Sequence, residues 1–359
     1  MNSRSTDATL VSSAPNITYL TGYSGFSTLE REAYLLIVSQ HQVLTDKTPG
    51  VIGYILTDGR YTEAVRNIPH FTLLEISPIN SLEKILIMLI KKHKIKKLGI
   101  EENNLTVSEY RILKKHFSIL RHVNLNGLRS IKEKDEILAI EKACRIGDKA
   151  FDYIIGKIKK GVTEKELAFE IEFFIKKANA AISFPPIVAF GKNTAIPHHQ
   201  PTNRKLLTNN FVLLDFGAKV NNYCSDMTRT VFFGKPTAEQ KRMYQTVLEA
   251  QKKAIDHLGW WRGSDLDSSE VDRVARDYII SKGYPTIPHS LGHGIGLQVH
   301  ESPTLSPKSK DILKPGMVFS VEPGIYIPGF GGVRIEDLVV LEPSGPRLLT
   351  KSLREFLEL

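Results

Sequence analysis

Four carboxylates in the second half of the chain lie within or next to apolar runs, where charged side chains are rare. Asp215 follows the run FVLL, and Asp226 comes 11 residues later in NYCSDMTRT. Glu322 lies in MVFSVEPG, and Glu336 lies in GVRIED. A single buried aspartate is more often part of a salt bridge or a cap than a metal ligand. Four ionised carboxylates cannot share a core without cations, however, because burying an unpaired charge is very costly. We therefore expect the fold to gather these side chains around positive charge.

Histidines add to this pattern. The segment HSLGHGIGLQVHE holds His289, His293 and His300 among glycines that allow close backbone approach. His198 and His199 stand together in IPHHQPTNR, in a predicted loop of the kind that often carries binding residues. Hard oxygen ligands with one imidazole suit two divalent ions of the Mn, Co or Zn type better than a closed structural zinc site. Two such ions can share a water and generate hydroxide near neutral pH, so these residues favour a dinuclear hydrolase.

Residues 1–127 read as an α/β domain. Two helical patterns, SLEKILIMLIKKHK and TVSEYRILKKHF, alternate with short apolar runs. Those runs are ATLVSS, AYLLIVS, VIGYILTDG, HFTLLEIS and KKLGIEE. The alternation predicts a mixed or parallel sheet with helices on its faces.

Residues 128–359 show a different pattern of predicted helices and strands. An amphipathic helix is predicted from residue 131 up to Gly161, and Thr163 with Glu166 forms a capping box for a second helix that runs to about Lys177. Strand-like runs then surround one long helical block at residues 237–283. This order predicts an α+β domain in which helices pack on an antiparallel sheet.

Composition limits where in the cell the protein is expected and which classes of partner it is expected to bind. The chain has 359 residues, and no apolar run reaches the roughly 18–20 residues of a membrane span. Two cysteines, Cys144 and Cys224, and the absence of a signal-peptide pattern predict a cytoplasmic protein without a membrane partner. The net charge of +9 is spread along the chain, and the lysine cluster at residues 91–97 reads as a solvated helix end. We therefore expect no nucleic-acid partner.

Five segments in the second domain resemble, in order and spacing, one metallopeptidase family. The segments LLDFGA, SDMTRT, HSLGHGIGLQVHE, VEPGIY and VRIED are similar to those of the family that contains aminopeptidase P, prolidase and methionine aminopeptidase. In the first domain, NITYLTGYSGF and LTDGRYTEA resemble the creatinase-type N-terminal domain of the proline-specific members. The resemblance implies a "pita-bread" catalytic domain over residues 128–359, preceded by a creatinase-type domain over residues 1–127. It also implies a homodimer in which the first domain limits the size of the peptide.

The resemblance further implies a set of metal ligands. They are Asp215, Asp226, His293, Glu322 and Glu336. Asp226 and Glu336 would bridge two divalent ions, Asp215 would hold one ion alone, and His293 with Glu322 would complete the other. Manganese is the expected metal, with cobalt or zinc as alternatives. Glu322 is also our choice for the group that carries the proton of the nucleophile.

Other residues acquire roles by the same resemblance. His198 and His300 match catalytic histidines that contact the substrate near the scissile bond. His289 matches a histidine that lines the proline pocket, and Arg334 matches an arginine that supports the metal ligands. His199 has no counterpart and is expected to be a surface residue.

The implied reaction is hydrolysis of the bond between an N-terminal residue and a following proline in a peptide. Thr304 stands where some prolidases carry an arginine for the dipeptide carboxylate, so an Xaa-Pro aminopeptidase is favoured, with an Xaa-Pro dipeptidase (prolidase) as the alternative. A remote alternative is a non-catalytic RNA- or protein-binding protein on the same fold. Gln298 replaces a common acidic residue. The Trp260–Trp261 pair is expected to have a packing role, with a dimer contact or a substrate contact as the alternative.

Overall fold

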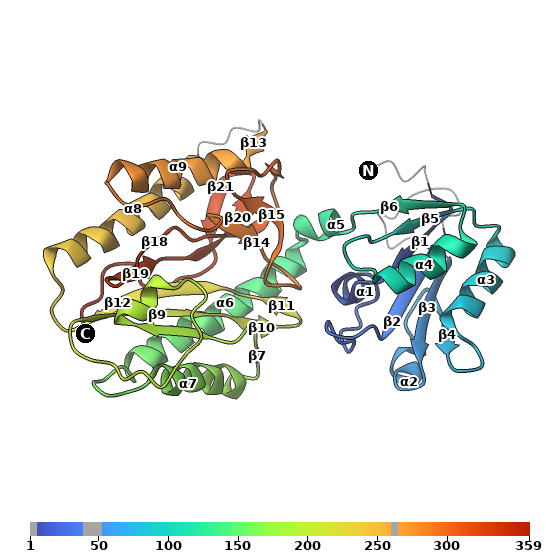
Figure 1. Ribbon diagram of the computed structural model, residues 1–359, viewed down its shortest axis with the longest axis horizontal. Coiled ribbons are helices and arrows are strands. Elements are labelled where there is room, and N and C mark those ends of the chain that lie inside the picture. Colours follow the sequence, from blue (N-terminus) through green and yellow to red (C-terminus); the bar gives the residue numbers. More distant parts are fainter. Residues whose placement is uncertain (1–5, 39–51, 260–264) are drawn as a thin grey trace. The chain divides into compact units, whose positions relative to one another are not determined.

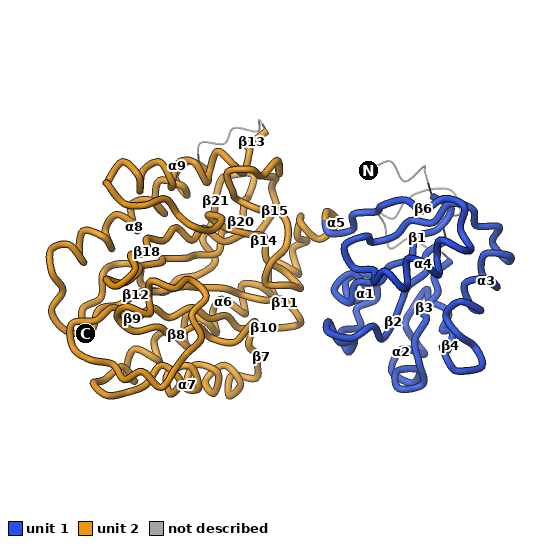
Figure 2. Tube along the Cα trace, in the orientation of Figure 1, with its two compact units in different colours: residues 1–126 blue, residues 127–359 orange. Residues whose placement is uncertain are grey.

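A computed structural model describes residues 6–38, 52–259 and 265–359, and the chain divides into two compact units, residues 1–126 and 127–359 (Figures 1 and 2). The Trp260–Trp261 pair lies outside the described residues. Within the described residues, no helix is long and apolar enough to cross a membrane.

The first unit is built on a six-stranded mixed sheet with the strand order β4-β3-β2-β1-β5-β6. Its strands are β1 (Ala8–Val11), β2 (Ala33–Val38), β3 (Ile52–Asp58), β4 (Phe71–Ile76), β5 (Lys97–Ile100) and β6 (Ile119–His122). Strand β1 pairs antiparallel with β2 and parallel with β5, so the predicted mixed sheet is confirmed. Strand β6 was missed because only its first two residues, Ile119 and Leu120, are apolar, and they are too few to form a recognisable run.

Helices cover this sheet. They are α1 (Ala14–Thr21), α2 (Thr62–Val65), α3 (Leu82–His93) and α4 (Val107–His116), followed by α5 (Asn126–Ser130) at the boundary of the units. Helices α3 and α4 bury Leu86, Leu89 and Leu113 against strand residues such as Leu36 and Leu56. The two predicted helical patterns are confirmed, and each helix begins after an N-cap residue, Ser81 or Thr106, whose side chain accepts a hydrogen bond from the first turn.

The second unit contains two pairs of helices. They are α6 (Lys134–Ile155) with α7 (Glu164–Lys177), and α8 (Ala238–Gly259) with α9 (Ser268–Ser281). The capping box of Thr163 and Glu166 is confirmed at the start of α7. The predicted end of α6 at Gly161 is wrong, because the helix already ends at Ile155 with Gly156 as its C-cap residue. The predicted single block at residues 237–283 is also wrong, since Asp267 caps a new helix by accepting a hydrogen bond from Ser269 N.

Antiparallel strands fill the space between these helix pairs (Figure 1). A three-stranded sheet has the order β12-β9-β8, with β8 (Ile187–Phe190), β9 (Asn210–Phe216) and β12 (Met227–Phe233). A five-stranded sheet has the order β15-β14-β17-β20-β21, with β14 (Gly292–Gly294), β15 (Glu301–Leu305), β17 (Val318–Val321), β20 (Asp337–Glu342) and β21 (Gly345–Leu348). Between β17 and β20 the chain forms the hairpin of β18 (Gly324–Ile327) and β19 (Gly331–Arg334).

Short strands complete the unit. A small sheet joins β7 (Ala181–Ile182), β10 (Ala218–Val220) and β11 (Tyr223–Cys224), and β13 (Leu266–Asp267) pairs with β16 (Ile312–Leu313). Residues of α6 and α7 share a core with β8, β9 and β12, and those of α8 and α9 share a core with β17, β19 and β20. The predicted α+β architecture of helices on antiparallel strands is confirmed.

Candidate metal centre

The acidic candidates lie at strand ends that meet in the second unit. Asp215 of β9 pairs with Thr228 of β12, and Asp226 lies two residues before Thr228. Residues two apart on a strand share a face, so the two aspartates are diagonal neighbours. Glu322 directly follows β17, and Glu336 lies between β19 and β20.

His293 reaches the same place from the short strand β14. The preceding residue is a glycine for a steric reason, because a Cβ atom on Gly292 would overlap the backbone carbonyl of Ser320. This close approach allows the Ser320 hydroxyl to accept a hydrogen bond from His293 N at 3.0 Å. Strand β14 is thereby held against β17, next to Glu322.

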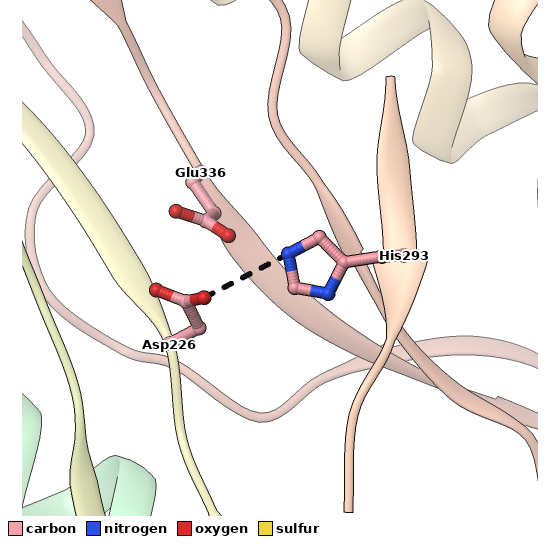
Figure 3. Close-up of side chains that lie close together, drawn as sticks. All are labelled: Asp226, His293 and Glu336. Carbon is pink, nitrogen blue, oxygen red and sulfur yellow. Dashed lines mark ion pairs between the residues drawn. The ribbon is translucent and has the colours of Figure 1, made fainter. Parts of the chain in front are cut away.

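Asp226, His293 and Glu336 form the tightest acidic and histidine group of the described residues (Figure 3). Each offers one ligand atom, and these atoms lie within 4.8 Å of one another. His293 Nε2 is 3.8 Å from Asp226 Oδ2 and 3.3 Å from Glu322 Oε1. No described residue hydrogen-bonds to Asp226 Oδ1 or Glu336 Oε1, although both atoms are buried. A cation would satisfy these oxygens, so the donor set fits a metal ion.

The tautomer of His293 also suits metal binding. Its Nδ1 lies 3.1 Å from the carbonyl oxygen of Gly294, and a carbonyl can only accept, so Nδ1 carries the proton. When the ring loses its second proton, as metal binding requires, the Nε2 lone pair therefore faces the carboxylates. This arrangement, in which the second ring nitrogen is fixed by a backbone carbonyl, is typical of histidine ligands.

The charges of the group are poorly balanced without a cation. Burial, together with repulsion among the carboxylates, raises the pKa of Asp226 and of Glu336 well above the usual range. Burial opposes charge on His293, but its contacts with Glu322 and Glu336 raise its pKa to about 9. Burial would also raise the pKa of Glu322, but the same His293 contact lowers it to about 2. Protons therefore compete with metal ions for this site.

Arg334 links Asp215 to the rest of the group. Its Nη2 lies 2.5 Å from Asp215 Oδ2, and its Nε donates to the hydroxyl of Thr228 at 3.0 Å. Thr228 Oγ1 in turn donates to Glu336 Oε2 at 2.7 Å. Burial raises the pKa of Asp215, while the guanidinium opposes that rise. Arg334 therefore braces two of the candidate ligands, directly at Asp215 and through Thr228 at Glu336.

Three histidines surround these ligands. The His300 ring lies 4.3 Å from the His293 ring between centroids. His289 accepts a hydrogen bond from the Tyr326 hydroxyl at 2.9 Å, and that hydroxyl accepts one from Arg334 Nη1 at 2.8 Å. Burial lowers the pKa of His289 and of His300, so both are neutral at pH 7. His198 is exposed and lies near enough to Asp215, His289 and His300 for an electrostatic interaction with each of them.

The prediction that His199 is a surface residue is wrong. Its side chain is buried, and its Nε2 lies 2.9 Å from Glu164 Oε2. Sequence reasoning could not separate two adjacent histidines in one loop, and Glu164 looked like an ordinary first-turn acid of a helix. Tyr326 and Thr228 were also missed, although Thr228 stands at the same-face spacing from Asp226 that strand periodicity provides.

The segment around His300 is held on both of its sides by buried charged groups, at Gln298 and at Glu301. Glu301 Oε1 lies 2.7 Å from Arg129 Nη1, and Glu301 Oε2 lies 3.6 Å from Lys132 Nζ. Gln298, which replaces a common acidic residue, accepts a hydrogen bond from Arg129 Nη2 at 2.8 Å. A carboxylate at residue 298 would also suit this guanidinium, so the glutamine preserves the contact with less charge.

Three further residues singled out in the sequence also have clear positions. Thr304 is exposed and pairs with His293 across β14 and β15, so position 304 lies beside the metal group. Cys144 and Cys224 are buried, and burial raises the pKa of both thiols. High thiol pKa values argue against a cysteine nucleophile.

The buried carboxylates, the oriented imidazole and the neutral histidines beside them define a metal-dependent hydrolase. Residues 139–343 match metallopeptidase family M24, and residues 1–131 match the Creatinase/Prolidase N-terminal domain. The chain belongs to metallopeptidase family M24. The expected creatinase-type α/β domain and pita-bread catalytic domain are thereby confirmed.

Similar proteins cover most or nearly all of the chain. An Xaa-Pro dipeptidase of Pyrococcus furiosus is 38% identical over 323 residues, which cover 85% of this chain and 89% of that protein. The structure is similar to an Xaa-Pro dipeptidase from Bacillus anthracis, with a TM-score of 0.88, 36% identity and coverage of 99% and 95% of the two chains. It is also similar to an X-Pro aminopeptidase from Thermotoga maritima MSB8, with a TM-score of 0.82, 32% identity and coverage of 99% and 98%.

Proposed function

We propose that this protein is a metal-dependent peptidase that hydrolyses the bond between an N-terminal residue and a following proline, with Xaa-Pro dipeptides as its preferred substrates. The observation that carries this proposal is the group of Asp226, His293 and Glu336, which holds two buried carboxylate oxygens without hydrogen-bond partners among the described residues. Such a group is costly to the fold unless it binds cations.

Two divalent ions would be held by five side chains, namely Asp215, Asp226, His293, Glu322 and Glu336. When bound, they would lower the pKa of a shared water and polarise the substrate carbonyl. Four carboxylates and one imidazole make a hard donor set, so manganese is our first choice of metal, before cobalt or zinc.

The side chains around the ligands supply the remaining chemistry. Glu322 accepts the proton of the attacking water and delivers it to the proline nitrogen as the C–N bond breaks. The Ser320 hydroxyl, 3.0 Å from Glu322 Oε1, helps to orient that carboxylate. His198 and His300 donate hydrogen bonds to the developing oxyanion and to the leaving proline nitrogen. His289, fixed by the Tyr326 hydroxyl, lines the pocket for the proline ring.

The choice of a dipeptidase reverses our expectation from the sequence. The similar proteins named above include two Xaa-Pro dipeptidases, and these names support the dipeptidase alternative better than the aminopeptidase. Thr304 is the observation that favours an aminopeptidase, because no guanidinium stands at this position to pair with a dipeptide carboxylate. The similarity to the structure of an X-Pro aminopeptidase also supports the aminopeptidase as the second candidate function.

A comparison of substrates tests the proposal. Purified protein with added Mn²⁺ is given Ala-Pro, Ala-Pro-Ala and Ala-Ala, and product release is followed by chromatography. We expect fast cleavage of Ala-Pro, slow cleavage of Ala-Pro-Ala and little cleavage of Ala-Ala. Faster cleavage of Ala-Pro-Ala would favour the aminopeptidase. Tight, salt-sensitive RNA binding without metal-stimulated hydrolysis would favour the binding-protein alternative.

We also propose that the protein is a homodimer in which the first unit limits the length of bound peptides. A closed dimer would be isologous, with one surface patch meeting its own copy. Light scattering at micromolar concentration should give twice the mass of the chain, and a monomer there would contradict the dimer.

A further inference from the structure

One carboxylate beside the proposed site gathers an unusual number of hydrogen bonds. Glu164, the first residue of α7, is fully buried. Its Oε1 accepts hydrogen bonds from Phe190 N at 2.9 Å and Asn193 Nδ2 at 2.8 Å. Its Oε2 accepts from His199 Nε2 at 2.9 Å, Thr202 N at 2.9 Å and Thr202 Oγ1 at 2.6 Å. All of these donors belong to residues 190–202, so a single side chain ties both ends and the middle of one segment.

This segment carries His198. The residue before it, Pro197, offers its carbonyl oxygen to Arg334 Nη1 at 3.4 Å, and the residue after it, His199, is bound to Glu164. His198 is therefore bracketed by one contact to the arginine that pairs with Asp215 and one contact to the buried glutamate. Its own side chain is exposed.

The charge of Glu164 fits this arrangement. Burial alone would raise its pKa, but the hydrogen bonds from Thr202, His199, Asn193 and Phe190 lower it, so the group is ionised at neutral pH. Hydrogen bonds to an ionised acceptor are about twice as strong as neutral ones. The carboxylate also stands in the first turn of α7, where the helix dipole favours a negative charge.

We propose that Glu164 is a positioning residue for the peptidase reaction, which holds the backbone of residues 190–202 so that His198 faces the scissile bond. His199 takes part in this positioning, because its imidazole ring hydrogen-bonds to Glu164 and so connects the backbone of residues 190–202 to that carboxylate. The proposal rests on the function proposed above, because it requires that His198 contacts the substrate.

The alternative is a clamp that only stabilises the fold. A clamp would lower stability when broken, and its effect on activity would not depend on His198. A positioning residue acts through His198, so its effect on activity should vanish once the imidazole has been removed. Coupling between the two residues therefore separates the two possibilities.

A double-mutant cycle on the full chain with Mn²⁺ provides the test. The variants are Glu164→Gln, His198→Ala and the double variant, and kcat and KM are measured with Ala-Pro. We expect each single change to lower kcat by about 10- to 100-fold, since a displacement of the order of 1 Å can cost this much. In the His198→Ala background, Glu164→Gln should lower kcat by less than about twofold. Equal losses in both backgrounds would overturn the inference.

Controls keep the test informative. Glu172→Gln on the same helix changes a carboxylate that pairs with Lys176 and should leave kcat and KM unchanged. Thr202→Val removes one donor and keeps the side-chain shape, so it should reproduce a smaller, still His198-dependent loss if Glu164→Gln fails to fold. An unaffected His198→Ala variant would contradict the proposed role of His198 and this inference together. A large His198→Ala loss with an independent Glu164 effect contradicts the inference alone.

Discussion

Asp226 is buried, no described residue hydrogen-bonds to its Oδ1, and its pKa is raised. The metal-free fold must therefore bury a negative charge or take up a proton, and both cost stability at neutral pH. Asp226→Asn removes this charge and keeps the shape of the side chain. In the presence of a chelator we expect the variant to melt about 2–4 °C above the wild-type protein, which corresponds to roughly 1 kcal/mol for a domain of this size. Mn²⁺ should stabilise the wild type and leave the variant unchanged, and calorimetry with and without metal measures both effects.

A matched control is Asp277→Asn, which alters an exposed aspartate of α9. Its melting temperature should match that of the wild type with and without metal. A lower melting temperature for metal-free Asp226→Asn would show that the carboxylate stabilises the fold, contrary to our account.

The metal-free protein should lose stability as the pH rises. His293 has a pKa of about 9 in the fold, against about 6.5 when unfolded, so between these values the folded state binds more protons. The free energy of unfolding therefore falls with rising pH, by about 2–3 kcal/mol between pH 6.5 and 9. The raised pKa values of Asp226 and Glu336 act in the same direction. The lowered values of His289 and His300 act oppositely, but only below about pH 6.5.

Urea unfolding with a chelator at pH 6.5 and pH 9 measures this slope. Protein saturated with Mn²⁺ serves as the control, and its slope should be weaker because metal replaces the protons. If the free energy of unfolding of the metal-free protein stays level or increases over this pH range, then His293, Asp226 and Glu336 do not bind additional protons in the folded state.

The sequence patterns predicted the candidate metal ligands better than they predicted the residues that hold the surrounding backbone in place. Asp215, Asp226, Glu322 and Glu336 were visible because charge within or next to apolar runs is costly. Glu164 was not, because its partners come from residues 190–202 and only the folded chain brings them to α7. Adjacent residues such as His198 and His199 differ in burial through the local backbone path, which composition does not encode.

At the scale of elements, helix α9 holds the loop that carries His289. Arg276 pairs with the buried Asp272 at 2.8 Å and donates to the carbonyl oxygens of Ile287 and His289. Asp272 also accepts a hydrogen bond from Leu291 N at 3.1 Å. One ion pair on the helix therefore fixes both sides of the loop.

Arg276→Ala should leave Asp272 as a buried charge without its counter-ion and lower stability by about 3 kcal/mol. Because the His289 loop would move, we expect KM for Ala-Pro to rise more than kcat falls. Thermal unfolding and steady-state kinetics measure the two effects. Arg273→Ala, on the same helix with a single exposed partner at 3.9 Å, should change neither. A KM equal to that of the wild type in the Arg276→Ala variant would show that the His289 loop does not form part of the proline pocket.

The sequence predicted the boundaries of helices correctly where nearby residues, such as a capping box, determine them. The Thr163–Glu166 capping box marked the start of α7, and long amphipathic patterns marked α3, α4 and α6. The C-terminal end of α6 at Gly156 was missed because Gly161 offered a second plausible stop. Two-residue strands such as β13 have no periodicity to detect, and they form because tertiary pairing stabilises them.

At the scale of the whole molecule, all five proposed ligands lie in the second unit. Residues 127–359 have their own hydrophobic cores, so we expect this fragment to fold and to bind metal like the full chain. It should lose the dimer and the limit on peptide length that we assign to the first unit. Circular dichroism and isothermal titration with Mn²⁺ test this, and a folded fragment without metal affinity would place a ligand in the first unit.

We propose that the buried carboxylates and His293 make this chain a metal-dependent Xaa-Pro peptidase. The most direct measurement is proline release from Ala-Pro by chelator-treated protein during a titration with Mn²⁺. We predict no release without metal, and a rise that reaches its plateau at about two ions per chain, the number that a shared-water mechanism needs. Undiminished release in the presence of the chelator, or no release at any metal concentration, would contradict the account.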